Sequence, residues 1–176
     1  GFSDGTALVE IPALILGGVA MGDGAIPVPM GATPLPENQT FRALIGSEQA
    51  SVIASLADER RAVASRFGVR DLPSTEAWID CRAGALKGEG SRPVPSRADA
   101  RAMLRDGVAG SLVPLLSAAK MAGVSVPVTE AIIALVSSVL GADIAPTGRK
   151  LETIGIVAND ADEARTILDS ISKGGK

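Results

Sequence analysis

Arg101 and Asp106 are the two charged residues of this chain whose types and spacing could form a binding or catalytic site. A guanidinium at position 101 could hold a carboxylate through two parallel hydrogen bonds. An aspartate at position 106 could orient a catalytic base, or it could cap a helix that begins near residue 111. Residues five apart do not share a helix face, and Gly107 and Gly110 predict that the backbone turns before the next helix. A helix cap with a surface arginine is therefore the alternative to a working site.

The residue types that the chain lacks limit its chemistry further. It contains no histidine, no tyrosine and one cysteine, Cys81. Without histidine, neither a Ser-His nor a Cys-His nucleophile can be assembled, and the commonest zinc ligand is missing, so we expect no metal site. Proton transfer near neutral pH would need a carboxylate, a lysine, Cys81 or a group from outside this chain. A single cysteine also excludes an intrachain disulfide, so we expect a cytoplasmic protein.

Composition predicts a single all-α domain over residues 1–176. Hydrophobic residues make up 46% of the chain and aromatic residues 2%, so its core must consist of Ala, Leu, Ile and Val, which suits close-packed helices. The net charge of −3, with 17 basic and 20 acidic residues interspersed, argues against nucleic acid as a partner. The longest apolar run, residues 7–21, is interrupted by Pro12, Gly17 and Gly18, so we expect no membrane-spanning segment.

Helical periodicity predicts the elements that must position the charged residues. We expect helices at residues 7–21, 41–67, 75–84, 98–105, 111–121, 126–141 and 160–174, with one short helical turn at 147–155. Residues 22–37 form a proline-rich loop, and residues 86–97 form a polar connector. Ser74 or Thr75 caps the third helix, Pro127 lies near the start of the sixth, and Gly141 ends it. No segment shows the alternation of a half-buried strand.

Three weaker patterns have a plain structural interpretation. Ser117 and Lys120 match a pattern in which lysine activates serine, but the companion motifs are absent, so we expect a packed helix with Lys120 in solvent. Cys81, next to Arg82, is interpreted as a small core residue rather than a reactive thiol. The charged run at residues 57–68 is interpreted as the solvated face of a long helix with ion pairs along it.

A series of short motifs follows Arg101 in a fixed order. These are Asp106, Leu-Val-Pro at 112–114, Gly123 and Val124 with Pro127, and Gly-Arg-Lys-Leu at 148–151. Residues 101–156 thereby resemble the C-terminal domain of the octopine/nopaline (opine) dehydrogenase family. That family carries an arginine, an acidic pair ending in aspartate, Gly-Leu-Val-Pro, Gly-Val-x-x-Pro and a late Gly-Arg-Thr-Leu. Residues 56–69 are similar to its Asp-x-Glu-Arg segment, so the resemblance covers almost the whole chain.

The resemblance implies an all-helical substrate-binding domain, a bundle of the kind found in 6-phosphogluconate and opine dehydrogenases. In the opine family this domain follows a Rossmann domain that binds NAD(P), and the enzyme reductively condenses an amino acid with a 2-oxo acid. The matched arginine, Arg101, would bind the substrate carboxylate, and the matched Asp106 would pair with a catalytic histidine. Residues 1–176 contain no Gly-x-Gly-x-x-Gly fingerprint, so we expect no cofactor-binding residue here. NAD(P) would bind only if a Rossmann-domain chain is present as a partner.

The chain departs from the family at the position of the histidine. The family's histidine precedes a proline in the first helix, where this chain has Ile11 with Glu10 beside it. Asp106 or Glu10 would then have to perform the acid–base or orienting role. Arg105 replaces the usual acidic neighbour of Asp106, and the segment from 106 to 114 is one residue longer than in the family.

Three functional hypotheses are consistent with these residues. The chain is the substrate-binding part of an opine-dehydrogenase-like oxidoreductase whose nucleotide domain is supplied elsewhere. Alternatively, it is a stand-alone, cofactor-free cyclase, isomerase or lyase, in which Arg101 stabilises a developing negative charge and a carboxylate moves the proton. The third hypothesis is a non-catalytic dimerisation or binding module. A small carboxylate is the expected ligand of the first, and an apolar helical domain is expected to form a homodimer.

Overall fold

The structure is a computed structural model that describes residues 2–17 and 40–172. Its long helices are α1 (Thr6–Leu16), α2 (Ser47–Arg66), α3 (Thr75–Ala83), α4 (Arg97–Gly107), α5 (Val113–Ala122), α6 (Pro127–Leu140) and α7 (Ala161–Ser172). Short helical turns are η1 (Phe41–Leu44), η2 (Val108–Leu112), η3 (Ala145–Thr147) and η4 (Glu152–Ile154). Between its described residues the chain forms isolated β-bridges and no strand, which confirms the all-α prediction.

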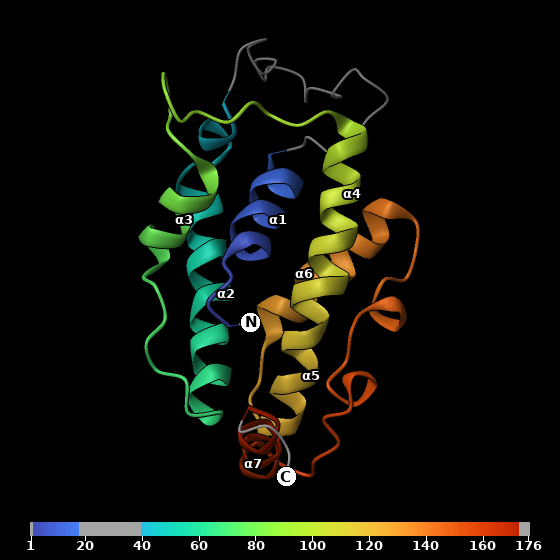
Figure 1. Ribbon diagram of the computed structural model, residues 1–176. Coiled ribbons are helices and arrows are strands. Elements are labelled where there is room, and N and C mark those ends of the chain that lie inside the picture. The colour runs from blue at the N-terminus through green and yellow to red at the C-terminus, as the bar shows by residue number, and fades with distance from the viewer. Residues whose placement is uncertain (1, 18–39, 173–176) are drawn as a thin grey trace.

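Helix α1 is the centre of the bundle. Figure 1 shows it between α2 and α3 on one side and α4 on the other. It is apolar nearly all round, and Leu8, Val9, Ile11 and Leu14 are all fully buried. A short helix that is hydrophobic on every face is stable in water only when other helices enclose it. The other described helices thus provide the environment that α1 requires.

Local signals set several helix ends as predicted. The Ser74 hydroxyl accepts a hydrogen bond from the Ala77 amide at 3.1 Å and caps α3. Pro127 is the first residue of α6, and Gly141, with a φ of +68°, ends it in the left-handed conformation. Helix α1 ends at Leu16, and Gly17 is its C-cap. Residues 18–21 of the predicted first helix, and the predicted proline-rich loop at 22–37, lie outside the described residues.

The predicted break near Gly107 and Gly110 is wrong. The backbone continues from α4 through the π-helical turn η2 into α5, and Gly107 (φ −65°, ψ −42°) is helical. A π-helical turn accommodates one extra residue within a continuous helix. This turn occupies residues 108–112. Asp106 therefore does not cap a following helix.

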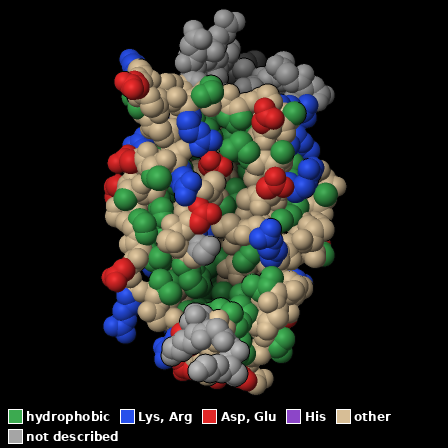
Figure 2. Space-filling model, viewed as in Figure 1, with side chains coloured by type: hydrophobic (Ala, Val, Ile, Leu, Met, Phe, Trp, Pro, Cys, Tyr) green, Lys and Arg blue, Asp and Glu red, His purple; other side chains and the backbone are tan. Residues whose placement is uncertain are grey.

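The face of the bundle that Figure 2 shows is mixed in charge. Basic and acidic side chains are intermingled on the face shown in Figure 2. Among the described residues, no single helix is long and apolar enough to cross a membrane. One bent pair of segments, Pro127–Leu140 with Ala145–Ile154, passes that test by length and composition only, with a bend of 107° between them.

Candidate functional site

Arg101 is a half-buried residue of α4 that contacts the end of α6. Its guanidinium donates to the carbonyl oxygens of Val139 (3.2 Å) and Leu140 (3.4 Å). These carbonyls belong to the last turn of a helix, where acceptors lack partners within the helix and a cation is favourable. Arg101 thus links α4 to α6, and it is not a fully exposed arginine.

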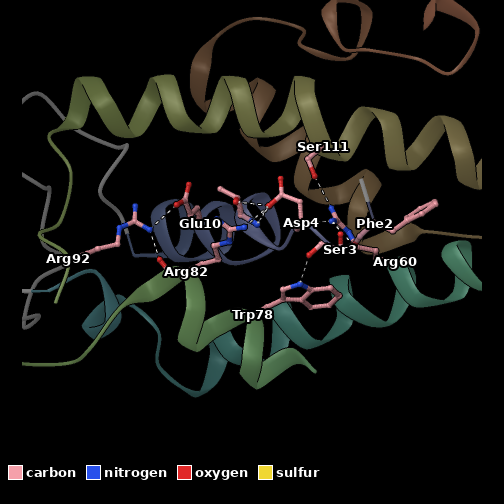
Figure 3. A network of polar contacts seen from close by, with 10 residues as sticks. Phe2, Ser3, Asp4, Glu10, Arg60, Trp78, Arg82, Arg92 and Ser111 are labelled. Atoms are coloured by element: carbon pink, nitrogen blue, oxygen red, sulfur yellow. Dashed lines mark hydrogen bonds and ion pairs between the residues drawn. The ribbon is translucent and has the colours of Figure 1, made fainter. Parts of the chain in front are cut away.

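Glu10 of α1 is committed to an ion pair. Its side chain is 14% exposed, and its Oε1 accepts from Nη1 of Arg92 at 2.8 Å. Arg92 also donates to the carbonyl oxygen of Arg82 and lies 4.4 Å from the ring centre of Phe41. Figure 3 shows Glu10 directed towards Arg92 along one side of α1. One oxygen of this carboxylate is therefore occupied by a contact within the chain.

The side chain of Asp106 is exposed near the end of α4, and it projects in a different direction from the side chain of Arg101. On a regular helix, residues five apart project about 140° from one another around the axis. Gly107, which follows Asp106, lies against α1 so closely that an added Cβ would stand 3.1 Å from Cδ1 of Ile11. The backbone beside Asp106 therefore packs against Ile11 of α1, while the Asp106 side chain itself is exposed, and the structure does not direct Arg101 and Asp106 at one point.

Arg60 is the residue that the sequence analysis missed. The run at 57–68 was interpreted as a solvated face, yet Arg60 is only 2% exposed. Its guanidinium donates to the carbonyl oxygens of Asp4 and Phe2 (3.4 Å to the latter) and to the Ser111 hydroxyl (2.7 Å), as Figure 3 shows. The helical spacing does contain the signal, because position 60 falls on the same stripe as the buried positions 53, 56, 57, 63 and 64.

Burial leaves the positive charge of Arg60 poorly compensated. Desolvation lowers the pKa of Arg60 to about 10, and the nearby negative charge of Asp4 opposes this only in part. In the part of the chain that the structure describes, no carboxylate forms an ion pair with Arg60, and its Nε is buried without a hydrogen-bond partner. A buried cation of this kind is costly unless a counter-ion reaches it.

Arg60 forms part of the wall of a cavity of about 290 Å³ beside η2. Its wall contains three basic residues, Arg60, Arg149 and Lys150, and one acidic residue, Asp4. The rest of the wall is uncharged and mostly apolar, and it consists of Phe2, Gly110, Ser111, Pro114, Leu115, Ala118, Leu151 and Ile154.

The segment that carries Arg149 and Lys150 is held firmly against η2 and α5. The Arg149 amide donates to the Ala109 carbonyl oxygen at 3.0 Å, and Gly148 lies so close to Val113 that an added Cβ would stand 2.5 Å from the Val113 Cβ. The Leu151 amide donates to the Ser117 hydroxyl at 3.1 Å. Both basic side chains are exposed at the cavity and placed by a well-anchored backbone.

Two of the remaining polar residues are structural. Ser117 is buried, and its hydroxyl accepts a hydrogen bond from the Leu151 amide. Lys120 is exposed, as the packed-helix interpretation expects. The carboxylate of Glu59 accepts from the amides of Val128 (2.7 Å) and Thr129 (2.8 Å) and so caps α6.

The charged run at 57–68 therefore divides between surface and interior. Asp58 and Arg61 form the expected exposed ion pair, whereas Glu59 and Arg60 make long-range contacts. The expectation that Cys81 is a core residue is wrong, because Cys81 is exposed.

Metal-ligand clusters and the Rossmann arrangement were the two kinds of cofactor site to look for in the described part of the chain. Within residues 2–17 and 40–172, no three His, Cys, Asp or Glu side chains gather in a way that could hold a metal ion. The same residues contain no strand leading into a glycine-rich helix start, which is the arrangement of a Rossmann-type dinucleotide site. Comparison of the chain with protein-family models finds no match, and comparison with curated proteins finds none either.

Proposed function

We propose that this chain is the helical substrate-binding domain of an opine-dehydrogenase-like oxidoreductase that acts on amino acid and 2-oxo acid substrates. In this proposal a Rossmann-domain partner chain supplies the nucleotide domain and, with it, NAD(P). The observation that supports the proposal most is the close packing of Gly107 on Ile11. In this proposal position 11 corresponds to the family's histidine, and the backbone next to Asp106 packs against it.

The position of the late Gly-Arg-Lys-Leu motif gives further support. Residues 148–151 lie against η2 and α5, so that motif and the one at 112–114 meet in space although the amphipathic helix α6 separates them in sequence. If the chain shares the fold of the opine family, the two motifs at 112–114 and 148–151 are expected to meet in space. In this proposal Arg101 contributes to binding of the substrate carboxylate, and Asp106 supplies the charge that orients the reacting group.

Native mass spectrometry of the protein purified from its own source tests the proposal. We expect a second chain of ordinary domain size in the complex and uptake of NADH or NADPH by that complex. The chain alone, as a monomer or homodimer without nucleotide uptake, would overturn the oxidoreductase proposal. Turnover of a small acid by the chain alone, with no nucleotide present, would instead support the cofactor-free enzyme.

Arg101→Gln tests the substrate-binding role within that complex. We expect KM for the 2-oxo acid to rise while the free energy of unfolding falls only slightly, since the two carbonyl contacts of Arg101 lie at a helix end that water can reach. Arg105→Gln is the matched control, because Arg105 is an exposed arginine one turn further along the same helix. Equal KM values for the two variants would exclude Arg101 from the substrate site.

A non-catalytic binding module is the second candidate, and a specific observation favours it. Glu10 is paired with Arg92 and Arg101 contacts α6, so two of the three residues assigned to chemistry have structural partners. The chain also lacks histidine altogether. This candidate predicts that Arg101→Gln and Glu10→Gln both leave partner binding unchanged in a pull-down with the co-purifying chain.

A further inference from the structure

The cavity beside η2 combines a poorly compensated buried cation with a mostly apolar wall. Arg60 is only 2% exposed and has no ion-pair partner within the described residues. Its Nε–H has no hydrogen-bond acceptor. Its guanidinium is held in place by the carbonyl oxygens of the N-terminal segment and by Ser111. These neutral acceptors satisfy hydrogen bonds but do not neutralise the charge.

The rim of the cavity adds to the positive potential. Arg149 and Lys150 are exposed there, so the wall carries three cations against one carboxylate. That carboxylate, Asp4, already accepts from the amide and hydroxyl of Thr6 and is 3.3 Å from Arg82. Low-dielectric walls concentrate the field of such a cluster and favour an anion in it.

The remaining wall indicates which kind of anion fits. Phe2, Pro114, Leu115 and Ile154 supply apolar surface, and the volume of about 290 Å³ is at the small end of ligand cavities. A phosphate would leave that surface uncovered, whereas a carboxylate with a short apolar tail would cover it. We propose that this cavity binds a small carboxylate with an apolar tail, held at the charged end by Arg149, Lys150 and the field of Arg60. The proposal does not depend on the opine-type assignment, and it concerns a place other than Arg101 and Asp106.

Isothermal titration of the full chain with 4-methylpentanoate, which is not a 2-oxo acid, tests the proposal. We expect binding of this branched carboxylate and much weaker binding of the neutral 4-methylpentanamide, which has a similar shape but no charge. The double variant Arg149→Gln/Lys150→Gln removes both exposed cations and should weaken binding about three- to tenfold. Both residues are at the surface, so this variant is expected to fold.

Arg66→Gln/Arg70→Gln is the matched control, because it removes the same charge from exposed positions outside the cavity wall. Unchanged affinity in the control, with the loss confined to the Arg149 and Lys150 variant, supports the proposal. Equal weakening by both pairs would show a general charge effect and overturn it. Equal binding of the amide, absence of binding, or binding of inorganic phosphate in place of the branched carboxylate would each overturn it as well. None of these readouts involves nucleotide, so the result is separate from that of the oxidoreductase test.

Discussion

Replacing Glu59 by alanine should destabilise the protein by about 3 kcal/mol. The carboxylate of Glu59 accepts from the amides of Val128 and Thr129 and from the Thr129 hydroxyl at 2.7 Å, and Thr129 is completely buried. Loss of a helix cap costs about 0.5–2 kcal/mol, and a buried donor left without an acceptor costs about 1–3 kcal/mol. The sum is a large part of the stability of a typical domain, which is about 5–15 kcal/mol.

Urea unfolding followed by circular dichroism measures this effect. We expect the midpoint to fall while the slope m stays constant, because the native state loses a cap without changing the surface exposed on unfolding. Asp58→Ala is the control. It removes the neighbouring carboxylate, which is 79% exposed and paired with Arg61 at 3.0 Å, and should cost less than about 1 kcal/mol. If Glu59→Ala costs no more than Asp58→Ala, Glu59 does not cap α6 and the reasoning is refuted.

Two further predictions concern stability. Gly148→Ala should destabilise by about 1–3 kcal/mol, because the new Cβ would lie 2.5 Å from the Val113 Cβ. Gly110→Ala, where an added Cβ meets nothing within 4 Å, should instead stabilise by about 0.5–1 kcal/mol, and urea unfolding of the pair distinguishes packing from a general glycine effect. The second prediction uses pH. Because burial lowers the pKa of Arg60 to about 10, well below its ordinary value, the unfolded state binds more protons at pH values between the two. The stability of the wild type relative to Arg60→Met should therefore rise with pH above about 10, by at most about 1.4 kcal/mol per pH unit. A difference that is constant from pH 9 to 11.5 would contradict this assignment.

The class of fold and many helix ends could be predicted from the sequence alone. The abundance of small aliphatic residues and the scarcity of aromatic ones predict packed helices, and the structure has them. Ser74, Pro127 and Gly141 mark their helix ends because capping, a fixed φ and the left-handed conformation act within one turn of the chain.

Which charged residues are buried, and where the helices continue, depends on tertiary packing and could not be predicted from local sequence. Arg60 and Arg61 are the same residue type side by side, yet the first is enclosed by the N-terminal segment and η2 while the second pairs with exposed Asp58. Gly107 stays helical because it packs on Ile11, and this contact outweighs the weak helix propensity of glycine.

The same holds for the candidate site. The contacts of Glu59 with α6 and of Arg149 with η2 join residues about seventy and forty positions apart. Local patterns report on neighbours within a turn or two, whereas these contacts depend on how whole helices pack. Arg101, Asp106 and Glu10 could therefore be selected as candidates from their residue types. The packing of the bundle then shows that Arg101 and Glu10 have partners within the chain, and that a poorly compensated charge is buried at Arg60.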